Sequence, residues 1–189
     1  MDTDVIMAKN NKLKSVLPYI GIPVIGAALL ILQAGRTAAF IMFRSELLVI
    51  LGYIAMVTDI KMKKIHNSLT IAMLAAWILI MVPKIFLDTD AAVELLIDSV
   101  IGFAVGGGLF LLIYLISRKG LGGGDVKFMA ATGLYLGLSG ALSAMFCGTI
   151  LAALSGLALI LLKKIGRKDT IPLAPFLYAG MLVTMFLTN

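Results

Sequence analysis

The run FMAATGLYLGLSGALSAMFCGTILAALSGLALILL, residues 128–162, contains no charged side chain. A single α-helix of this length would extend for roughly 50 Å, whereas the hydrocarbon core of a bilayer is only ~30 Å thick. The cluster Gly137-Leu138-Ser139-Gly140 interrupts the run with residues typical of breaks. The stretch therefore predicts two membrane helices. The first is short and either crosses the membrane or is re-entrant, and the second ends near Leu162.

Similar apolar runs occur along the rest of the chain, whose 189 residues are 61% hydrophobic and only 14% charged. A typical soluble domain is about half apolar and a quarter charged, so a water-soluble core does not account for this composition. The additional runs cover residues 16–34, 47–58 with an extension back through 38–43, 69–87, 99–117 and 171–188. We expect an all-α polytopic membrane bundle of about seven helices, or six if the fifth is re-entrant. It forms a single domain over residues 1–189, with 1–15 as a short N-terminal tail.

The net charge of +6 is explained by membrane orientation, because cytoplasmic loops collect Lys and Arg. With seven helices and a cytoplasmic N-terminus, only Arg36, Arg44 and Lys84 face outward. The cytoplasmic segments then hold Lys9, Lys12, Lys14, Lys61, Lys63, Lys64, Arg118, Lys119, Lys127, Lys163, Lys164, Arg167 and Lys168. We therefore expect a multi-pass protein of the inner (cytoplasmic) membrane, with the lipid bilayer rather than nucleic acid as its partner. The first run also has features of a secretory signal, but it is longer than a usual signal core.

Two acidic residues lie at the cytoplasmic boundary of this predicted topology. Asp59 ends the second helix and Asp125 begins the fifth. Each carboxylate on its own could be a solvated helix-end residue paired with a nearby lysine. Together, one protonated and one ionised carboxyl group form an acid–base pair that can hydrolyse a peptide bond without a metal ion. No metal site is expected, since His66 and Cys147 are the single His and Cys of the chain.

Glycines precede the second acid in the segment Gly122-Gly123-Gly124-Asp125-Val126-Lys127. They remove side-chain bulk and allow a peptide backbone to approach the carboxyl group. The spacing and the Lys-Ser/Thr ending of a Walker phosphate loop are absent, which disfavours phosphate binding. The segment resembles the GxGD motif of the type IV prepilin peptidases, a family of aspartyl membrane proteases. Gly122 or Gly123, together with Gly124, would be the motif glycines, and Lys127 its usual lysine.

A second segment resembles the region around the other aspartate of this family. Asp59 is followed by Ile65-His66-Asn67, where His66 replaces the proline of an Ile-Pro-Asn turn. Asn67 and Ser68 remain available to cap the third helix. Near the C-terminus, Ile171-Pro172-Leu173-Ala174-Pro175-Phe176 is similar to a Pro-rich segment that opens the last helix of the family. Proline is common in the first turn of any helix, so these prolines need no catalytic role.

The resemblance implies an aspartic endopeptidase that cleaves prepilins or pseudopilins at the cytoplasmic membrane face, after a glycine and before an apolar helix. Asp59 and Asp125 would be catalytic, with Gly122, Gly123, Gly124, Lys127 and Asn67 supporting the motif. No cofactor is implied. Larger members carry a four-cysteine domain and methylate the new N-terminus with S-adenosylmethionine. A chain with one cysteine looks like the compact form, for which methylation is not expected.

Two other classes of function fit parts of the sequence. A proton-coupled transporter could use the two acids as relay groups, but its helices would carry more polar residues at mid-membrane. A non-enzymatic pilus or secretion scaffold would use them only to balance the basic loops. Gly102, Gly106, Gly133 and Gly137 are spaced for close helix contact. They would contact either a substrate helix entering from the lipid or, as is more common, another helix of the protein itself.

Overall fold

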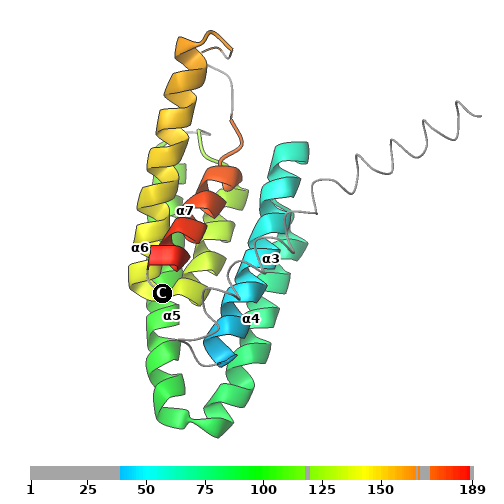
Figure 1. Ribbon diagram of the computed structural model, residues 1–189, viewed down its shortest axis with the longest axis vertical. Coiled ribbons are helices and arrows are strands. Elements are labelled where there is room, and N and C mark those ends of the chain that lie inside the picture. Colours follow the sequence, from blue (N-terminus) through cyan, green and yellow to red (C-terminus); the bar gives the residue numbers. More distant parts are fainter. Residues whose placement is uncertain (1–38, 118–119, 165, 167–170, 188–189) are drawn as a thin grey trace, which may run out of the picture.

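The computed structural model describes residues 39–117, 120–164, 166 and 171–187. This part of the chain forms the helices α3 (Ala39–Met62), α4 (Asn67–Leu87), α5 (Thr89–Ile116), α6 (Gly123–Leu161) and α7 (Ala174–Leu187). The predicted all-α class is confirmed (Figure 1). The helix predicted over residues 16–34 lies outside the described residues, so the total of seven helices stays a prediction.

Four of these helices, α3 to α6, are long and apolar enough to cross a membrane, and α7 is a shorter apolar helix. Large apolar side chains face outward along them; Leu79 is 73% exposed and Phe86 is 85% exposed. A soluble protein rarely leaves so much apolar surface in water, whereas lipid accommodates it at no cost. The outward-facing surface and the helix lengths together indicate a multi-pass membrane protein.

Helices α4 and α5 form a hairpin whose tip is Asp88, so α5 begins ten residues before the apolar run that predicted it. The Asp88 carboxylate accepts the backbone N–H of Ala91 at 3.3 Å and pairs with the Lys84 ammonium at 3.3 Å. The Ala91 N–H, followed by the Lys84 side chain, lowers the pKa of Asp88 below its ordinary value. This cap ends α4 and starts α5 without a loop.

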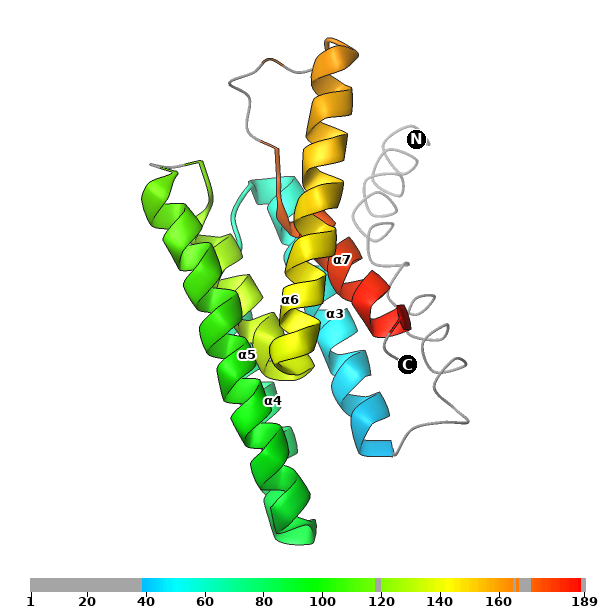
Figure 2. The same ribbon diagram turned by 90° about the vertical axis from the view of Figure 1, so that its left-hand side faces the viewer.

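Helix α6 is broken at Gly137, where φ is 70° and ψ is −171°. Only glycine adopts this conformation readily, and the predicted break at this cluster is confirmed. The break divides α6 into a first segment, residues 123–136, and a second segment, residues 138–161. Figure 2 shows that the chain reverses at this point beside α5, which continues beyond the turn. At 1.5 Å per residue the first segment is about 21 Å long.

The turn is held against α5 by a side chain and by close backbone contact. The Asp98 carboxylate accepts the backbone N–H of Leu138 at 3.0 Å, which caps the second segment. A Cβ atom at Gly102 would overlap the carbonyl oxygen of Gly133, and one at Gly106 would lie 2.9 Å from that of Met129. All four glycines predicted to mediate helix contact, Gly102, Gly106, Gly133 and Gly137, are buried in this interface. The alternative of packing within the protein is therefore confirmed, and these glycines do not face a substrate.

We predict that Gly137→Ala lowers the free energy of unfolding by about 1–3 kcal/mol, because alanine is strained at this backbone conformation. The added Cβ would also collide with the Asp98 carboxylate. Gly108→Ala on α5 is the matched control, since a Cβ atom there meets nothing within 4 Å. Thermal unfolding in detergent should show a lower Tm for Gly137→Ala only. An equal Tm for both variants would contradict this account of the turn.

Candidate active site

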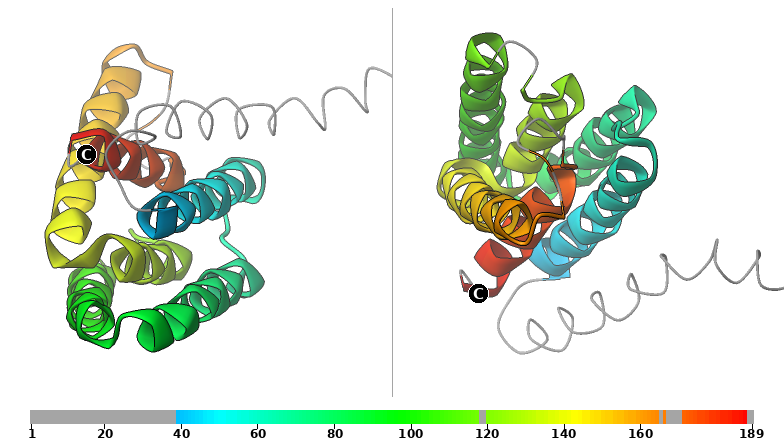
Figure 3. Two further views of the ribbon diagram at one scale, coloured as in Figure 1. Left: turned by 60° about the horizontal axis from the view of Figure 1, so that its bottom comes forward. Right: turned by 90° about the horizontal axis from the view of Figure 1, so that it is seen from above.

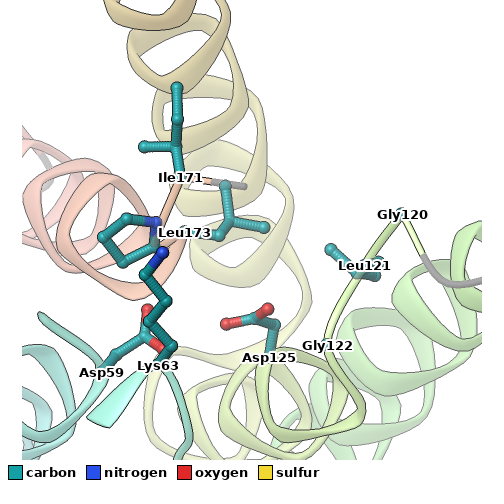
Figure 4. Close-up of a pocket in the computed structure, with 9 residues that line it drawn as sticks. Asp59, Lys63, Gly120, Leu121, Gly122, Asp125, Ile171 and Leu173 are labelled. Atoms are coloured by element: carbon teal, nitrogen blue, oxygen red, sulfur yellow. The ribbon is translucent and has the colours of Figure 1, made fainter. Parts of the chain in front are cut away.

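The two predicted acids lie on opposite walls of one cavity of about 310 Å³. Asp59 comes from the last turns of α3, and Asp125 comes from the first turn of α6. Figure 4 shows their carboxyl groups pointing toward the same space. The remaining lining residues are Lys63, Gly120, Leu121, Gly122, Ile171, Pro172 and Leu173. The structure thus brings together two groups that the sequence could only place at the same end of the bundle.

Asp59 is held in position by the start of α7. Its side chain is buried, and its Oδ2 atom accepts the backbone N–H of Ala174, the first residue of α7, at 3.1 Å. An N–H at a helix N-terminus has no partner within the helix, so a carboxylate at this position satisfies it. The Pro-rich segment is therefore part of the site. Pro172 lines the cavity and Pro175 lies in the first turn of α7.

Helix α3 ends one turn after Asp59. The backbone N–H of Lys63 donates to the Asp59 carbonyl at 2.7 Å, and Lys63 itself has a φ of 49°. A left-handed residue at this point is a common way to stop a helix, although it is usually glycine. The reversal directs the Lys63 side chain over the cavity (Figure 4). From the sequence, Lys63 was expected only as one of the basic residues of a cytoplasmic loop and as a possible partner of a nearby carboxylate.

Asp125 differs from Asp59 in its partners. Its side chain is buried, and its Oδ1 atom has no hydrogen-bond partner within the described part of the chain. Its backbone N–H donates to the Gly122 carbonyl at 3.1 Å, which starts α6. The carboxyl group is therefore fixed by its backbone and surroundings, with one oxygen left for water or a ligand.

The three glycines before Asp125 have different environments. A Cβ atom on Gly122 would lie 2.9 Å from the Asp125 Oδ2 atom, and one on Gly124 would lie 3.0 Å from the Ile65 Cβ. A Cβ atom on Gly123 would meet nothing within 4 Å. The sequence left open whether Gly122 or Gly123 matters. The geometry singles out Gly122 and Gly124.

The two remaining supporting residues join α4 to α6. The Lys127 ammonium donates to the Asn67 Oδ1 atom at 2.8 Å. The prediction that Asn67 or Ser68 caps α4 is wrong. The residue before the helix is His66, which makes no side-chain cap, and Asn67 instead uses its amide oxygen to bind Lys127.

The backbone at His66, which replaces the proline of the Ile-Pro-Asn turn, has a conformation that a proline could also adopt. Its φ is −73°, within the range that a proline ring imposes, and its ψ of 139° is extended. The turn between α3 and α4 thus keeps a proline-compatible shape with a histidine in place. A second cavity of about 330 Å³ opens beside this turn, and it also reaches Asp59 and Asp125.

Both acids lie within a part of the chain that matches a known protein family. A family model described as the type IV leader peptidase family matches residues 46–161, which include both acids. The chain belongs to the type IV leader peptidase family. It is similar to the prepilin leader peptidase/N-methyltransferase of Bacillus subtilis (strain 168), with 30% identity over 148 residues. The alignment covers 75% of this chain and 54% of that relative, so the chain spans about half the relative's length. No solved structure matches the chain significantly.

A metal centre at the two acids would require a group of ligating side chains among the described residues. No group of three or more His, Cys, Asp or Glu side chains is close enough there to hold a metal ion. The titratable side chains that line the two cavities are those of Asp59, Asp125, Lys63, Lys64 and Lys127.

If the two acids are catalytic, we predict that Gly122→Ala lowers the rate of peptide cleavage by about ten- to a hundredfold, because the added methyl group displaces the Asp125 carboxyl group. Gly123→Ala adds the same atom one residue later, where space is open, and should retain activity within about twofold. The measurement is the rate at which each variant cleaves a prepilin substrate when both variants are present in the membrane in equal amounts. If both variants lost activity equally, the loss would come from a general change in the glycine loop and not from contact of the added methyl group with Asp125.

Proposed function

We propose that this chain is a membrane-embedded aspartic endopeptidase that removes the leader of prepilin-like proteins at the cytoplasmic membrane face. Cleavage would occur after a glycine and before the substrate's apolar helix. The observation that carries this proposal is the pair of carboxyl side chains, from separate helices, on the walls of one cavity. Family membership and the similarity to the Bacillus subtilis prepilin leader peptidase/N-methyltransferase support it.

The proposed mechanism needs one ionised and one neutral carboxyl group. The ionised group takes a proton from the attacking water while the neutral group donates its proton to the scissile carbonyl oxygen, which forms a tetrahedral intermediate. When the C–N bond breaks, the proton taken from water passes to the leaving amine, and a hydroxyl proton of the intermediate returns to the second carboxylate as the carbonyl re-forms. Asp59 suits the ionised role, since an N–H at a helix N-terminus stabilises negative charge. Asp125 suits the neutral role, because its buried Oδ1 atom has no partner within the described residues.

We infer that the end of the bundle bearing the acids faces the cytoplasm. Lys61, Lys63, Lys64 and Lys127 belong to the helix ends at this side, and Lys163 and Lys164 follow the end of α6 there (Figure 2). Lys84 and the hairpin tip lie at the opposite end. An excess of basic residues marks the cytoplasmic side.

We further propose that both segments of α6 cross the bilayer, which gives seven crossings when residues 16–34 are included. The turn at Gly137 is level with Asp98, the last of three acidic residues in the first part of α5. Charged side chains avoid hydrocarbon, so Asp98 would mark the outer boundary of the membrane. A turn at this level would reach the outer surface, despite the short first segment.

Asp59→Asn and Asp125→Asn should each reduce prepilin processing by about a hundred- to ten-thousandfold while the protein still inserts. Each substitution removes the charge or the proton that the mechanism needs and keeps the side-chain shape. Co-expression with a prepilin, followed by its mobility shift, measures the loss. Asp88→Asn at the opposite end is the control and should process normally. Processing by either active-site variant would remove that acid from the mechanism, solute flux would indicate a transporter, and a wild type that never cuts would indicate a scaffold.

The topology has a separate test with single cysteines introduced into a Cys147→Ala background. With seven crossings, Asp88→Cys and Ser139→Cys react with a membrane-impermeant thiol reagent added outside, whereas Lys164→Cys reacts only after the membrane is opened. Ser139 is exposed at the α6 turn, so its accessibility reports the depth of the turn. If α6 were re-entrant, Ser139→Cys would stay unlabelled from both sides.

A further inference from the structure

A groove opens between α4 and α5 beside the acid site. It has a volume of about 330 Å³, and the first segment of α6 forms its floor. We refer to it as the α4–α5 groove. Its lining residues are Asn67, Thr70, Ile71 and Leu74 from α4, Phe103 from α5, and Lys127 and Ala130 from α6.

The shape of the groove follows from the arrangement of three helices. Helices α4 and α5 are joined at their far ends by the hairpin tip, and the first segment of α6 lies between them nearer the acids (Figure 3). The side chains of Ile71 and Phe103 are 63% and 40% exposed, so apolar surface faces outward from both walls. In a membrane protein this surface is open to lipid.

The floor of the groove is lined by small side chains. Thr70 and Ala130 are both buried at its base, and Gly107 of α5 lies against the Ala130 Cβ. Small residues are enriched where membrane helices associate, because they let another backbone approach closely. The glycines spaced for helix contact on α5 and α6 are already buried against each other. The groove is therefore a surface separate from that glycine contact.

The groove is continuous with the acid site. Asn67 and Lys127 line both the groove and the second cavity, which also contains Asp59 and Asp125. The Lys127–Asn67 hydrogen bond marks the junction of the two. Beyond this junction the lining changes from polar and charged groups to Ile71, Leu74 and Phe103.

We propose that the α4–α5 groove binds the first turns of the substrate's apolar helix and thereby sets the position of the scissile bond at the two acids. This inference rests on the proposed function. A leader peptidase substrate changes from polar leader to apolar helix at its cleavage point, and the lining changes in the same order. From Asn67 to Leu74 the groove extends about 10 Å along α4, enough for about two helical turns.

The charges around the second cavity favour the substrate's apolar helix, rather than its leader, as the part that provides most of the binding affinity. Lys63, Lys64 and Lys127 line the second cavity together with the two acids, so the cavity carries no net negative charge that would attract a leader with basic residues. Affinity must then come from the apolar part of the substrate. In lipid this affinity comes from close packing, which the groove and its small floor residues allow.

Photocrosslinking tests the location directly. A photoreactive amino acid is placed at Ile71 in the full-length Asp125→Asn variant, which is co-expressed with a prepilin in native membranes. The same residue at Ile150, which is 41% exposed on the second segment of α6, is the control. We expect crosslinks to the first two turns of the prepilin helix from position 71, at least about tenfold stronger than from position 150. Equal crosslinking from both positions, or none from position 71, would overturn the proposal.

A functional test uses variants that keep both acids. Ile71→Trp fills the groove and should slow prepilin cleavage by about tenfold, whereas the matched control Ile150→Trp, outside the groove, should cleave at the wild-type rate. Normal cleavage by Ile71→Trp would also overturn the docking role. A failure of the proposed function is distinguishable, because it would appear as no cleavage by the wild type, whereas crosslinking does not depend on hydrolysis.

Discussion

The hydrogen bond from the Ala174 N–H to the Asp59 carboxylate connects parts of the chain that are 115 residues apart. It satisfies a buried acid and a free helix-end donor at once, each of which is costly to leave unpaired in a low-dielectric environment. The same bond fixes where α7 starts relative to the end of α3. Since α7 also packs on the second segment of α6, the position of Asp59 is tied to that of the whole C-terminal half.

The position of Asp125 depends on a different constraint, the close contact between α5 and α6. Gly102 and Gly133 allow the two backbones to touch, and the turn at Gly137 lets α6 reverse beside α5. Asp98 holds this turn through Leu138. The depth of the first segment, and with it the height of Asp125, is therefore set by contacts about a dozen residues away, outside the active site. Glycines thus allow close helix packing in the bundle, and Gly122 leaves room for the Asp125 carboxyl group.

Much of this arrangement could be predicted from sequence because it depends on local patterns. Apolar runs predicted α3 to α7, and the length of the uncharged run predicted the break at Gly137. The predicted topology placed the two acids at the same end of the bundle. Side-chain contacts between residues far apart in the chain could not be predicted in this way. Asn67 was expected to cap a helix because it lies where the next apolar helix begins. Its side chain instead accepts a hydrogen bond from Lys127, which is 60 residues away in the chain. The hydrogen bond from the Ala174 N–H to Asp59 could not be predicted from neighbouring residues. Only the Pro-rich segment drew attention to this part of the chain.

The location of the acid pair at the junction of two environments matters for the proposed hydrolysis. The first cavity is bordered by Lys63 and Gly120 at the basic end of the bundle. In the proposed mechanism, water would reach the two carboxyl groups through this cavity. The α4–α5 groove approaches from the apolar side. A protease of this kind must supply water to the scissile bond while it keeps the substrate helix in lipid, because pulling an apolar helix into water is costly. Separate openings meet both needs, since neither water nor substrate has to pass through the space that the other occupies.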